Sequence, residues 1–485
     1  MTATPGRPAS RCRWWRAREA SLPLALHLFY LAGLCQFHVS DSEQARILGP
    51  SETERPVAAV LQRAGVSGAL GLYFGVHEQI QLYHRYAEAV WRGRDPRRDA
   101  TDPVQGTLVA YDDVEIEYQP GKLLLMVPPA LFSSSYSVYL PSFIVWSGFL
   151  YIAAVVGAIH ATGDGSARQA ARALWWSLSM LVLFGPYAAA HLDPAVALSC
   201  ALAWLAFRRG SRSGHLAWYG VCGALAAAGV FVKLAPAVLV AAAGIALLAV
   251  PARPRWREAR WLTLAFVAAL AAFHAASLAC WGDGYLASYA YHLKRGIQIE
   301  STWAGLLRAG SRWFGEPIPV AYSHGSYHLV TGLTPFLRPL FPIAWTGLAA
   351  LVVVRARRVA GDAEQVDPAE ALPLLTVILL LGLVLASGVF SFNYLLWLTP
   401  LMPAFVDRVR PWLSIGSTFA AALALTQLQR IYDYVYAKID PPAAALILLN
   451  LRNLTLIALL VALVRGLPRL LTGPPLARRN GTGRE

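Results

Sequence analysis

Long apolar runs alternate with short polar segments along almost the whole chain. A bilayer is crossed by a helix of roughly 20 apolar residues, and on this criterion the runs predict about twelve membrane-spanning helices. The runs cover 22–38, 141–161, 172–190, 193–208, 216–232, 234–250, 260–281, 336–355, 371–389, 393–406, 411–427 and 442–464. The expected fold class is therefore all-α: a polytopic transmembrane helical bundle that forms a single integral membrane domain over 1–485.

Arginine clusters between the runs predict the orientation of the bundle. They occur at 168–172, 208–212, 253–260, 355–358, 407–410 and 465–479, and all fall on one side under this helix assignment. Because loops rich in Lys and Arg stay in the cytoplasm, that side is expected to be cytoplasmic, together with the basic tail 1–21 and the tail 466–485. The first external loop, 39–140, and a second external segment, 282–335, are then expected outside.

The N-terminus resembles a signal peptide, because arginines precede an apolar stretch over 22–37. No small-x-small cleavage site follows it, so we interpret the stretch as a retained first helix.

Composition supports a membrane protein and argues against a nucleic-acid partner. Hydrophobic residues make up 56% of the chain and charged residues 14%, which is more apolar than a soluble globule of this length. The net charge of +14 is spread over short clusters between apolar runs, whereas nucleic-acid binding needs one basic surface. The five cysteines form no CxxC pair, which argues against a disulfide framework or a metal set.

The first external loop holds the most polar stretches of the chain, 77–86 and 111–121. The segment 122–132 that follows is apolar but too short to span, and crossing there would place every later arginine cluster outside. We therefore expect a membrane-embedded helix, broken by Pro128 and Pro129.

Two charged residues lie at or within apolar runs, where charge is costly and is a sign of function. Lys233 follows one run and Asp193 begins another. The alternative interpretations are that Lys233 snorkels at a helix end and that Asp193 caps its helix.

A third polar cluster lies in 291–301. On a helix, His292, Arg295 and Gln298 are spaced three apart and would share one face. An imidazole, a guanidinium and an amide on one face are suited to holding a phosphate. The alternative is an ordinary solvated loop helix.

Five short elements in order carry a resemblance. They are Tyr-x-x-Tyr-Ala with a preceding acid (78–87), Glu-Tyr-x-Pro-Gly (117–121), Lys-x-x-Pro (233–236), His-x-x-Arg-Gly-x-Gln-x-Glu-Ser (292–301) and Ser-x-x-Tyr-x-x-Trp-x-x-Pro (391–400). From about residue 70 to Asn453 the chain resembles glycosyltransferase family 87, the bacterial mannosyltransferases that use polyprenyl-phosphate sugars and have the C-type glycosyltransferase fold.

The resemblance implies an inverting hexosyltransferase, a mannosyltransferase by family, in the bacterial cytoplasmic (inner) membrane with its active face extracytoplasmic. Its partners would be a polyprenyl-phosphate sugar donor from the bilayer and a lipid or glycan acceptor. The residues expected at the donor phosphate are Lys233, Arg295 and His292. Those expected around the substrates are Tyr83, Tyr118, Asp193, Gln298, Glu300, Tyr394 and Trp397.

The catalytic base departs from the family pattern. An aspartate is expected four residues before Tyr83, where this chain has Gln79, and glutamine cannot accept a proton. The catalytic candidates are Glu78, one residue away, then Glu117 and Asp41, with Glu115 a further external acid. Loss of activity is the other explanation.

No cofactor is predicted. There is no Walker A loop and no soluble domain with an Asp-x-Asp motif, which argues against ATP and nucleotide-sugar chemistry. No metal is predicted, although Asp112, Asp113 and Glu115 form an alternative divalent-ion site.

Two other functions remain open. A transporter or flippase of lipid-linked sugars would use a similar basic and aromatic cavity, but such proteins usually contain internal repeats, and this sequence shows none. A catalytically inactive relative or assembly subunit is the third possibility, and Gln79 is its main support.

Overall fold

The computed structural model describes 20–32, 67–96, 108–162, 167–184, 188, 190–315, 317–323, 326–362, 366–403, 412–435 and 443–472. Within these residues the protein is mostly helical, and five helices are long and apolar enough to cross a membrane. These are α6 (Tyr136–Thr162), α11 (Trp256–Trp281), the segment Thr334–Arg358 across α14 (Thr334–Leu337) and α15 (Leu340–Asp362), α16 (Pro368–Ala386) and α19 (Ala443–Thr472).

The other helices are shorter or more polar. They are Ala20–Ala32, α3 (Ser67–Arg92), α4 (Pro120–Leu124), α5 (Val127–Ala130), α7 (Ala167–Phe184), α8 (Asp193–Ser213), α9 (Leu216–Val232), α10 (Ala237–Leu248), α12 (Leu286–Lys294), α13 (Thr302–Phe314), η3 (Phe392–Trp397) and α18 (Trp412–Val435).

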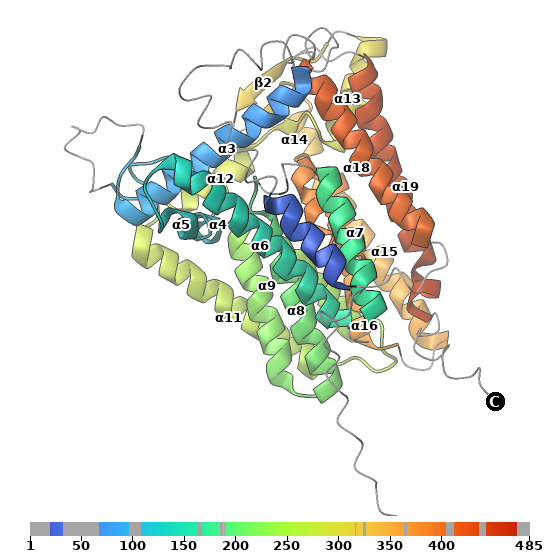
Figure 1. Cartoon of the computed structure of the whole chain (residues 1–485). Helices are drawn as coiled ribbons and strands as arrows, with labels where there is room; N and C mark the ends of the chain where they lie inside the picture. Colours follow the sequence, from blue (N-terminus) through green and yellow to red (C-terminus); the bar gives the residue numbers. More distant parts are fainter. Residues whose placement is uncertain are drawn as a thin grey trace, which may run out of the picture.

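The helices pack side by side as a bundle (Figure 1). α8 packs on α6 and α9, α9 on α11, α16 on α10, α15 and α19, and α18 on α19 and α3. The apolar window of α16 is 83% buried, whereas that of α11 is only 11% buried. Because a helix that is apolar all round must avoid water, α16 forms the centre of the bundle and the outer surface of α11 is suited to lipid.

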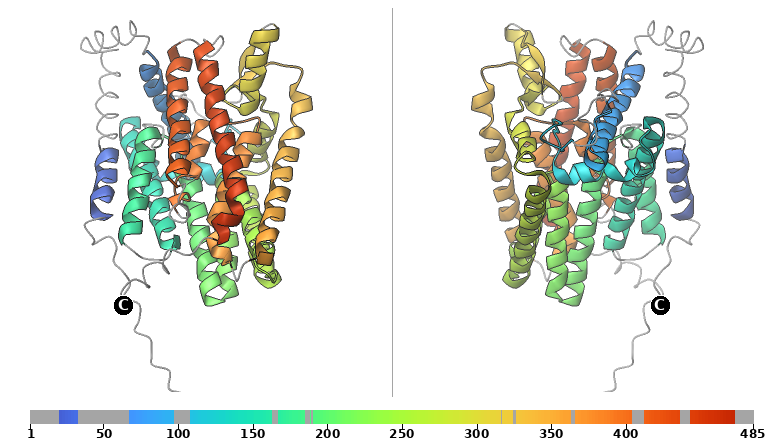
Figure 2. Two further views of the ribbon diagram at one scale, coloured as in Figure 1. Left: turned by 90° about the vertical axis from the view of Figure 1, so that its right-hand side faces the viewer. Right: turned by 90° about the vertical axis from the view of Figure 1, so that its left-hand side faces the viewer.

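The two ends of the bundle differ in chemistry. One end carries α3, α12, α13 and a small antiparallel sheet of β1 (Ile297–Gln298), β3 (Ser326–Leu329) and β2 (Val320–Ser323), in that order. The α8–α9 turn lies at the opposite end (Figure 2). There Ser211 donates a hydrogen bond to Asp367 at the start of α16, 2.7 Å away. The arginines at 208–212 thus lie at the other end of the bundle from the long polar segments, as their alternation along the chain predicts.

One sequence prediction needs correction. The span expected over 393–406 is wrong for the part that the structure describes: η3 ends at Trp397 and turns follow to Met402. Pro400 lacks the backbone N–H that a continuing helix needs. Within the first external loop, the structure describes a helix of 26 residues, α3.

The segment 122–132, expected to be embedded in the membrane, contains two short helical pieces with a break at 125–126, before the two prolines rather than at them. Its two pieces are α4 and α5, and Pro128 lies in the first turn of α5. Proline is tolerated there because the first N–H groups of a helix have no intrahelical partner.

The positive-inside orientation predicts where labels will react. In a background without the five native cysteines, cysteines at Ser51 and at exposed Gly315 should react with an impermeant thiol reagent in intact cells. A cysteine at exposed Ser213, in the arginine-rich turn, should react only after lysis. Labelling of Ser213→Cys in intact cells, together with protection of Gly315→Cys, would contradict the predicted orientation and favour the opposite one.

Candidate functional site

A cavity of about 350 Å³ lies near the polar end of the bundle. Polar residues line it from α3, the strand-like segment before α4, α4 itself, the start of α8, the end of α9, α12 and the chain after it, and η3. Apolar residues line it from the turn after α9 and from the end of α16. Segments more than 300 residues apart in the sequence therefore form one site.

Most of the residues predicted from the sequence meet in this cavity. Those that line it are Glu117, Tyr118, Asp193, Lys233, His292, Arg295, Gln298, Tyr394 and Trp397. Tyr83 is fully buried behind the cavity, with its ring centroid 5.6 Å from that of Tyr118. Glu300 is not among the lining residues.

The side chains of two predicted acids are not among those that the structure describes. Asp41 lies outside the described residues. Glu78 lies on α3 next to Gln79, but the side chains of α3 are described only from Gln79 onward. Both assignments stay predictions.

Lys233 and Asp193 form an ion pair of 2.8 Å at the cavity wall. Lys233 ends α9 in an extended conformation, three residues before Pro236, so its side chain leaves the helix axis. Its ammonium lies 4.4 Å from the centroid of Tyr394 and 4.9 Å from that of Trp397, and the Trp397 indole donates to the same Asp193 oxygen at 2.7 Å.

This arrangement replaces both simpler interpretations of the pair. Lys233 does not merely snorkel, because its ammonium is held by a buried carboxylate and two rings. Asp193 does not cap α8: it is the first residue of that helix, and the N-cap is Leu192.

The shared helical face predicted for His292, Arg295 and Gln298 is wrong. α12 ends at Lys294, Arg295 is outside the helix and Gln298 lies in β1. All three residues still line the cavity. The backbone N–H of Gln298 donates to the Gly388 carbonyl at 2.8 Å, which holds β1 against the chain just after α16.

Several polar atoms of the site are buried without a hydrogen-bond partner among the described residues. Arg295 Nε, Gln298 Oε1 and Asn393 Oδ1 all belong to residues that line the cavity. Buried polar groups are nearly always paired, so these atoms indicate a place for a polar ligand that both accepts and donates. Asn393 was not predicted, although it lies inside the 391–400 element.

Glu117 and Tyr118 form the acidic side of the cavity. The Tyr291 hydroxyl donates to Glu117, and Gln79 donates from Nε2 to the Tyr118 hydroxyl at 3.0 Å. Gln79 lines the cavity, so the position where the resembling family has its aspartate faces the site. Burial raises the pKa of Tyr118 well above its usual value, which keeps its hydroxyl neutral.

Lys122 is the main residue that the sequence analysis missed. It is 6% exposed, and its ammonium lies 3.6 Å from the ring centroid of Tyr118 and 5.1 Å from that of Tyr83. Burial lowers its pKa to about 7, and nearby Lys233 contributes in the same direction. The available signal was a single cation at the head of an apolar segment.

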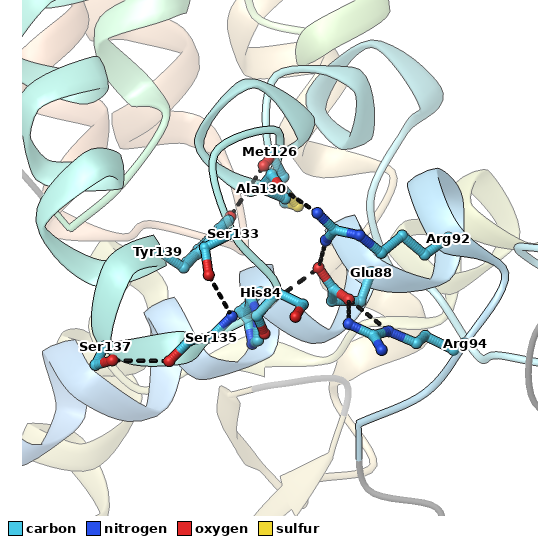
Figure 3. Close-up of polar contacts among 11 residues, drawn as sticks. His84, Glu88, Arg92, Arg94, Met126, Ala130, Ser133, Ser135, Ser137 and Tyr139 are labelled. Atoms are coloured by element: carbon cyan, nitrogen blue, oxygen red, sulfur yellow. Dashed lines mark hydrogen bonds and ion pairs between the residues drawn. The ribbon is translucent and has the colours of Figure 1, made fainter. Parts of the chain in front are cut away.

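A second polar cluster fixes α3 against α5 (Figure 3). Glu88 is fully buried and pairs with Arg92 and Arg94, and Arg92 donates to the Ala130 carbonyl at 2.9 Å. His84 contacts the Ser134 carbonyl at 3.1 Å. These contacts set the position of α3, and therefore of Gln79 and Tyr83, relative to α4.

Asp112, Asp113 and Glu115 are exposed and do not line the cavity. Among the described residues, no group of three or more His, Cys, Asp or Glu side chains is arranged to hold a metal ion. The alternative divalent-ion site therefore gains no support.

Fold and composition define the chain as a helical membrane protein. No family model, curated protein or solved structure matches it.

The ion pair predicts an asymmetric effect on stability. Lys233→Ala should destabilise the protein by about 3–5 kcal/mol, because it leaves the carboxylate of Asp193, 2% exposed, without its cation. Asp193→Asn should cost less, since Lys233 is 23% exposed and keeps its two rings. Thermal unfolding in detergent measures both, with the double variant Lys233→Met/Asp193→Asn as control. Equal stability of Lys233→Ala and the native protein would contradict the pairing.

Proposed function

We propose that this protein is a membrane glycosyltransferase that moves a sugar from a polyprenyl-phosphate donor to a hydroxyl of an extracytoplasmic lipid or glycan. The family resemblance makes mannose the expected sugar. One observation carries the proposal: residues from all five elements of the resemblance, which are scattered along the sequence, line the same cavity. Chance matches in unrelated loops would not be expected to meet.

The shape and chemistry of the cavity suit such a donor. Leu234, Ala235, Leu383 and Val384 give it an apolar side, and Arg295 and the other cations give it a charged side. A lipid phosphate has the same two parts. The amide oxygens of Gln298 and Asn393, which have no hydrogen-bond partner in the part of the chain that the structure describes, are acceptors suited to sugar hydroxyls.

The reaction is a direct displacement that inverts the anomeric carbon. Glu117 takes the proton of the acceptor hydroxyl while the oxygen of that hydroxyl bonds to the anomeric carbon. The bond between the anomeric carbon and the phosphate oxygen breaks, and its electron pair stays on the phosphate. Arg295, with Lys233 and His292 as the other predicted phosphate groups, stabilises the charge on the departing polyprenyl phosphate. Of the carboxylates that line the cavity, Asp193 is engaged by Lys233, which favours Glu117 as the base.

An inactive relative that binds a lipid-linked sugar is the second candidate, and Gln79 in the cavity favours it. A transporter would bind the same ligand but release it unchanged. Product analysis separates these possibilities from the enzyme.

The purified protein should convert polyprenyl-phosphate-mannose and an acceptor lipid to a product of inverted anomeric configuration. Glu117→Gln should lower turnover by roughly 10²–10⁴-fold, the contribution of a general base, with donor binding retained. Product mass measures turnover, and NMR of the anomeric proton gives the anomeric configuration.

Glu78→Gln is the matched variant for the base. Normal turnover by Glu117→Gln together with loss of turnover by Glu78→Gln would move the base to α3. Binding of the donor without any product in the native protein would favour the inactive relative, and release of intact donor across a vesicle membrane would favour the transporter.

Arg295 should be sensitive to geometry as well as charge. Its Nη2 donates to Ser326 at 3.0 Å and its Nε lacks a partner among the described residues, so the guanidinium is held and has a donor to spare. Arg295→Ala should weaken donor use by about 1.5–3 kcal/mol, and Arg295→Lys should restore only part of it. Initial-rate kinetics against donor concentration test this, and unchanged kinetics in both variants would remove Arg295 from the site.

A further inference from the structure

Three cations line the cavity, and they differ in what balances their charge. Lys233 is paired with Asp193 at 2.8 Å. Arg295 donates to a serine hydroxyl. Among the described residues the ammonium of Lys122 has neither an ion pair nor a hydrogen bond, and it contacts only the faces of Tyr118 and Tyr83.

A buried cation in this state is costly. Taking an ammonium out of water is unfavourable unless an anion or several hydrogen bonds replace the lost solvation, and ring faces offset only part of that cost. The two rings hold Lys122 in place: Tyr118 is fixed in turn by Tyr111, which donates to its carbonyl at 2.7 Å, and by Gln79. The side chain is therefore positioned at the cavity, near Asp193 and Glu117 but without an ion pair or hydrogen bond among the described residues.

We propose that Lys122, together with Arg295, neutralises the phosphate of the ligand, and that Lys233 instead holds Asp193 and the aromatic pair of η3 in position. The inference rests on the proposed function, because it assigns the anionic part of the same donor. It also changes the expectation from the sequence, in which Lys233 was the principal phosphate cation.

Helix α4 supports this role. Proline and glycine begin it, and a Cβ on Gly121 would lie 2.5 Å from the Phe231 carbonyl oxygen near the end of α9. Only glycine allows this close approach, which brings the short helix and Lys122 against the end of α9 where Lys233 lies. Two lysines held this close repel each other, and an anion between or beside them removes the repulsion.

Binding of an anion at Lys122 has a signature that needs no catalysis. At pH 8 a lysine with a pKa of about 7 is mostly neutral, and a bound phosphate raises that pKa, so binding should take up a proton. Affinity should fall between pH 7 and 8.5, a range in which the phosphate monoester itself is already largely dianionic because its second pKa is about 6.

Other groups in the cavity also titrate or carry charge. Those around Lys122 are Tyr83, Glu117, Tyr118, His191, Asp193, Lys233, Tyr291, His292 and Arg295. Comparison with a Lys122 variant is therefore what assigns the proton to this residue.

The test is calorimetric titration of the purified full-length protein in detergent with farnesyl phosphate, farnesol and inorganic phosphate, in buffers of different ionisation enthalpy. We expect farnesyl phosphate to bind more tightly than either other probe, with proton uptake at pH 8. Lys122→Met should weaken farnesyl phosphate binding roughly tenfold to hundredfold, the range for a hydrogen bond to a charged group, and abolish the uptake. Lys294→Met, at an exposed lysine outside the cavity, is the matched control and should change neither.

The outcomes separate the inference from the function on which it rests. If the native protein binds farnesyl phosphate no better than farnesol, the phosphate assignment and the proposed function both fail. If the native protein prefers the phosphate but Lys122→Met keeps the affinity and the uptake, only the role of Lys122 is overturned. Equal affinity for inorganic phosphate supports an anion site at Lys122 and contradicts a lipid donor.

A second variant covers loss of folding. Lys122→Arg keeps the charge and should retain most of the affinity while losing the proton uptake, because arginine stays protonated at pH 8. If Lys122→Met does not fold, retained uptake in Lys122→Arg, or no uptake in the native protein, overturns the proposal.

Discussion

The buried ion pair of Lys233 and Asp193 is the constraint on which the polar end of the bundle depends. A carboxylate that is 2% exposed in an apolar bundle must keep its cation, so the end of α9 and the start of α8 have to stay together. Trp397 must also reach Asp193, which fixes η3 beside them. A continuous membrane helix through this segment is incompatible with that geometry. The wall of the cavity is thus set by one buried carboxylate and its two partners, Lys233 and Trp397.

Much of the bundle could be predicted from apolar runs alone, because the bilayer demands long stretches of one kind. The runs at 141–161, 260–281 and 371–389 correspond closely to α6, α11 and α16. The run at 393–406 has a similar composition, but its described part, 393–403, does not form a spanning helix. Apolar composition reports burial, and a buried turn and a buried helix share it. Pro400 and the contact of Trp397 with Asp193, 204 residues earlier, distinguish them.

The residue types of the site could be predicted, but their arrangement could not. Lys233, Asp193 and Arg295 were identified because charge near a membrane is rare and costly. The prediction that Arg295 lies on a helical face was wrong, because α12 ends at Lys294. The pairing of β1 with β3 that follows is a tertiary contact with no local sequence signal. Lys122 was missed for the same kind of reason: its significance lies in its contact with two rings and in its lack of an ion pair or hydrogen bond among the described residues, which sequence spacing cannot reveal.

Gln79 changes the electrostatics of the cavity as well as its chemistry. The charged residues that line it are three cations, Lys122, Lys233 and Arg295, and two carboxylates, Glu117 and Asp193. With neutral histidines and a protonated Lys122, the lining carries one net positive charge, and an aspartate at position 79 would cancel it. Glutamine instead donates to the Tyr118 hydroxyl and leaves the positive charge in place. In a site of low dielectric, an aspartate at position 79 would repel an anionic ligand strongly. The neutral amide of Gln79 therefore favours such a ligand at the position where the resembling family has a base. In the proposed reaction the proton-accepting role would then fall to a carboxylate elsewhere, and Glu117, next to Tyr118, has no ion pair among the described residues.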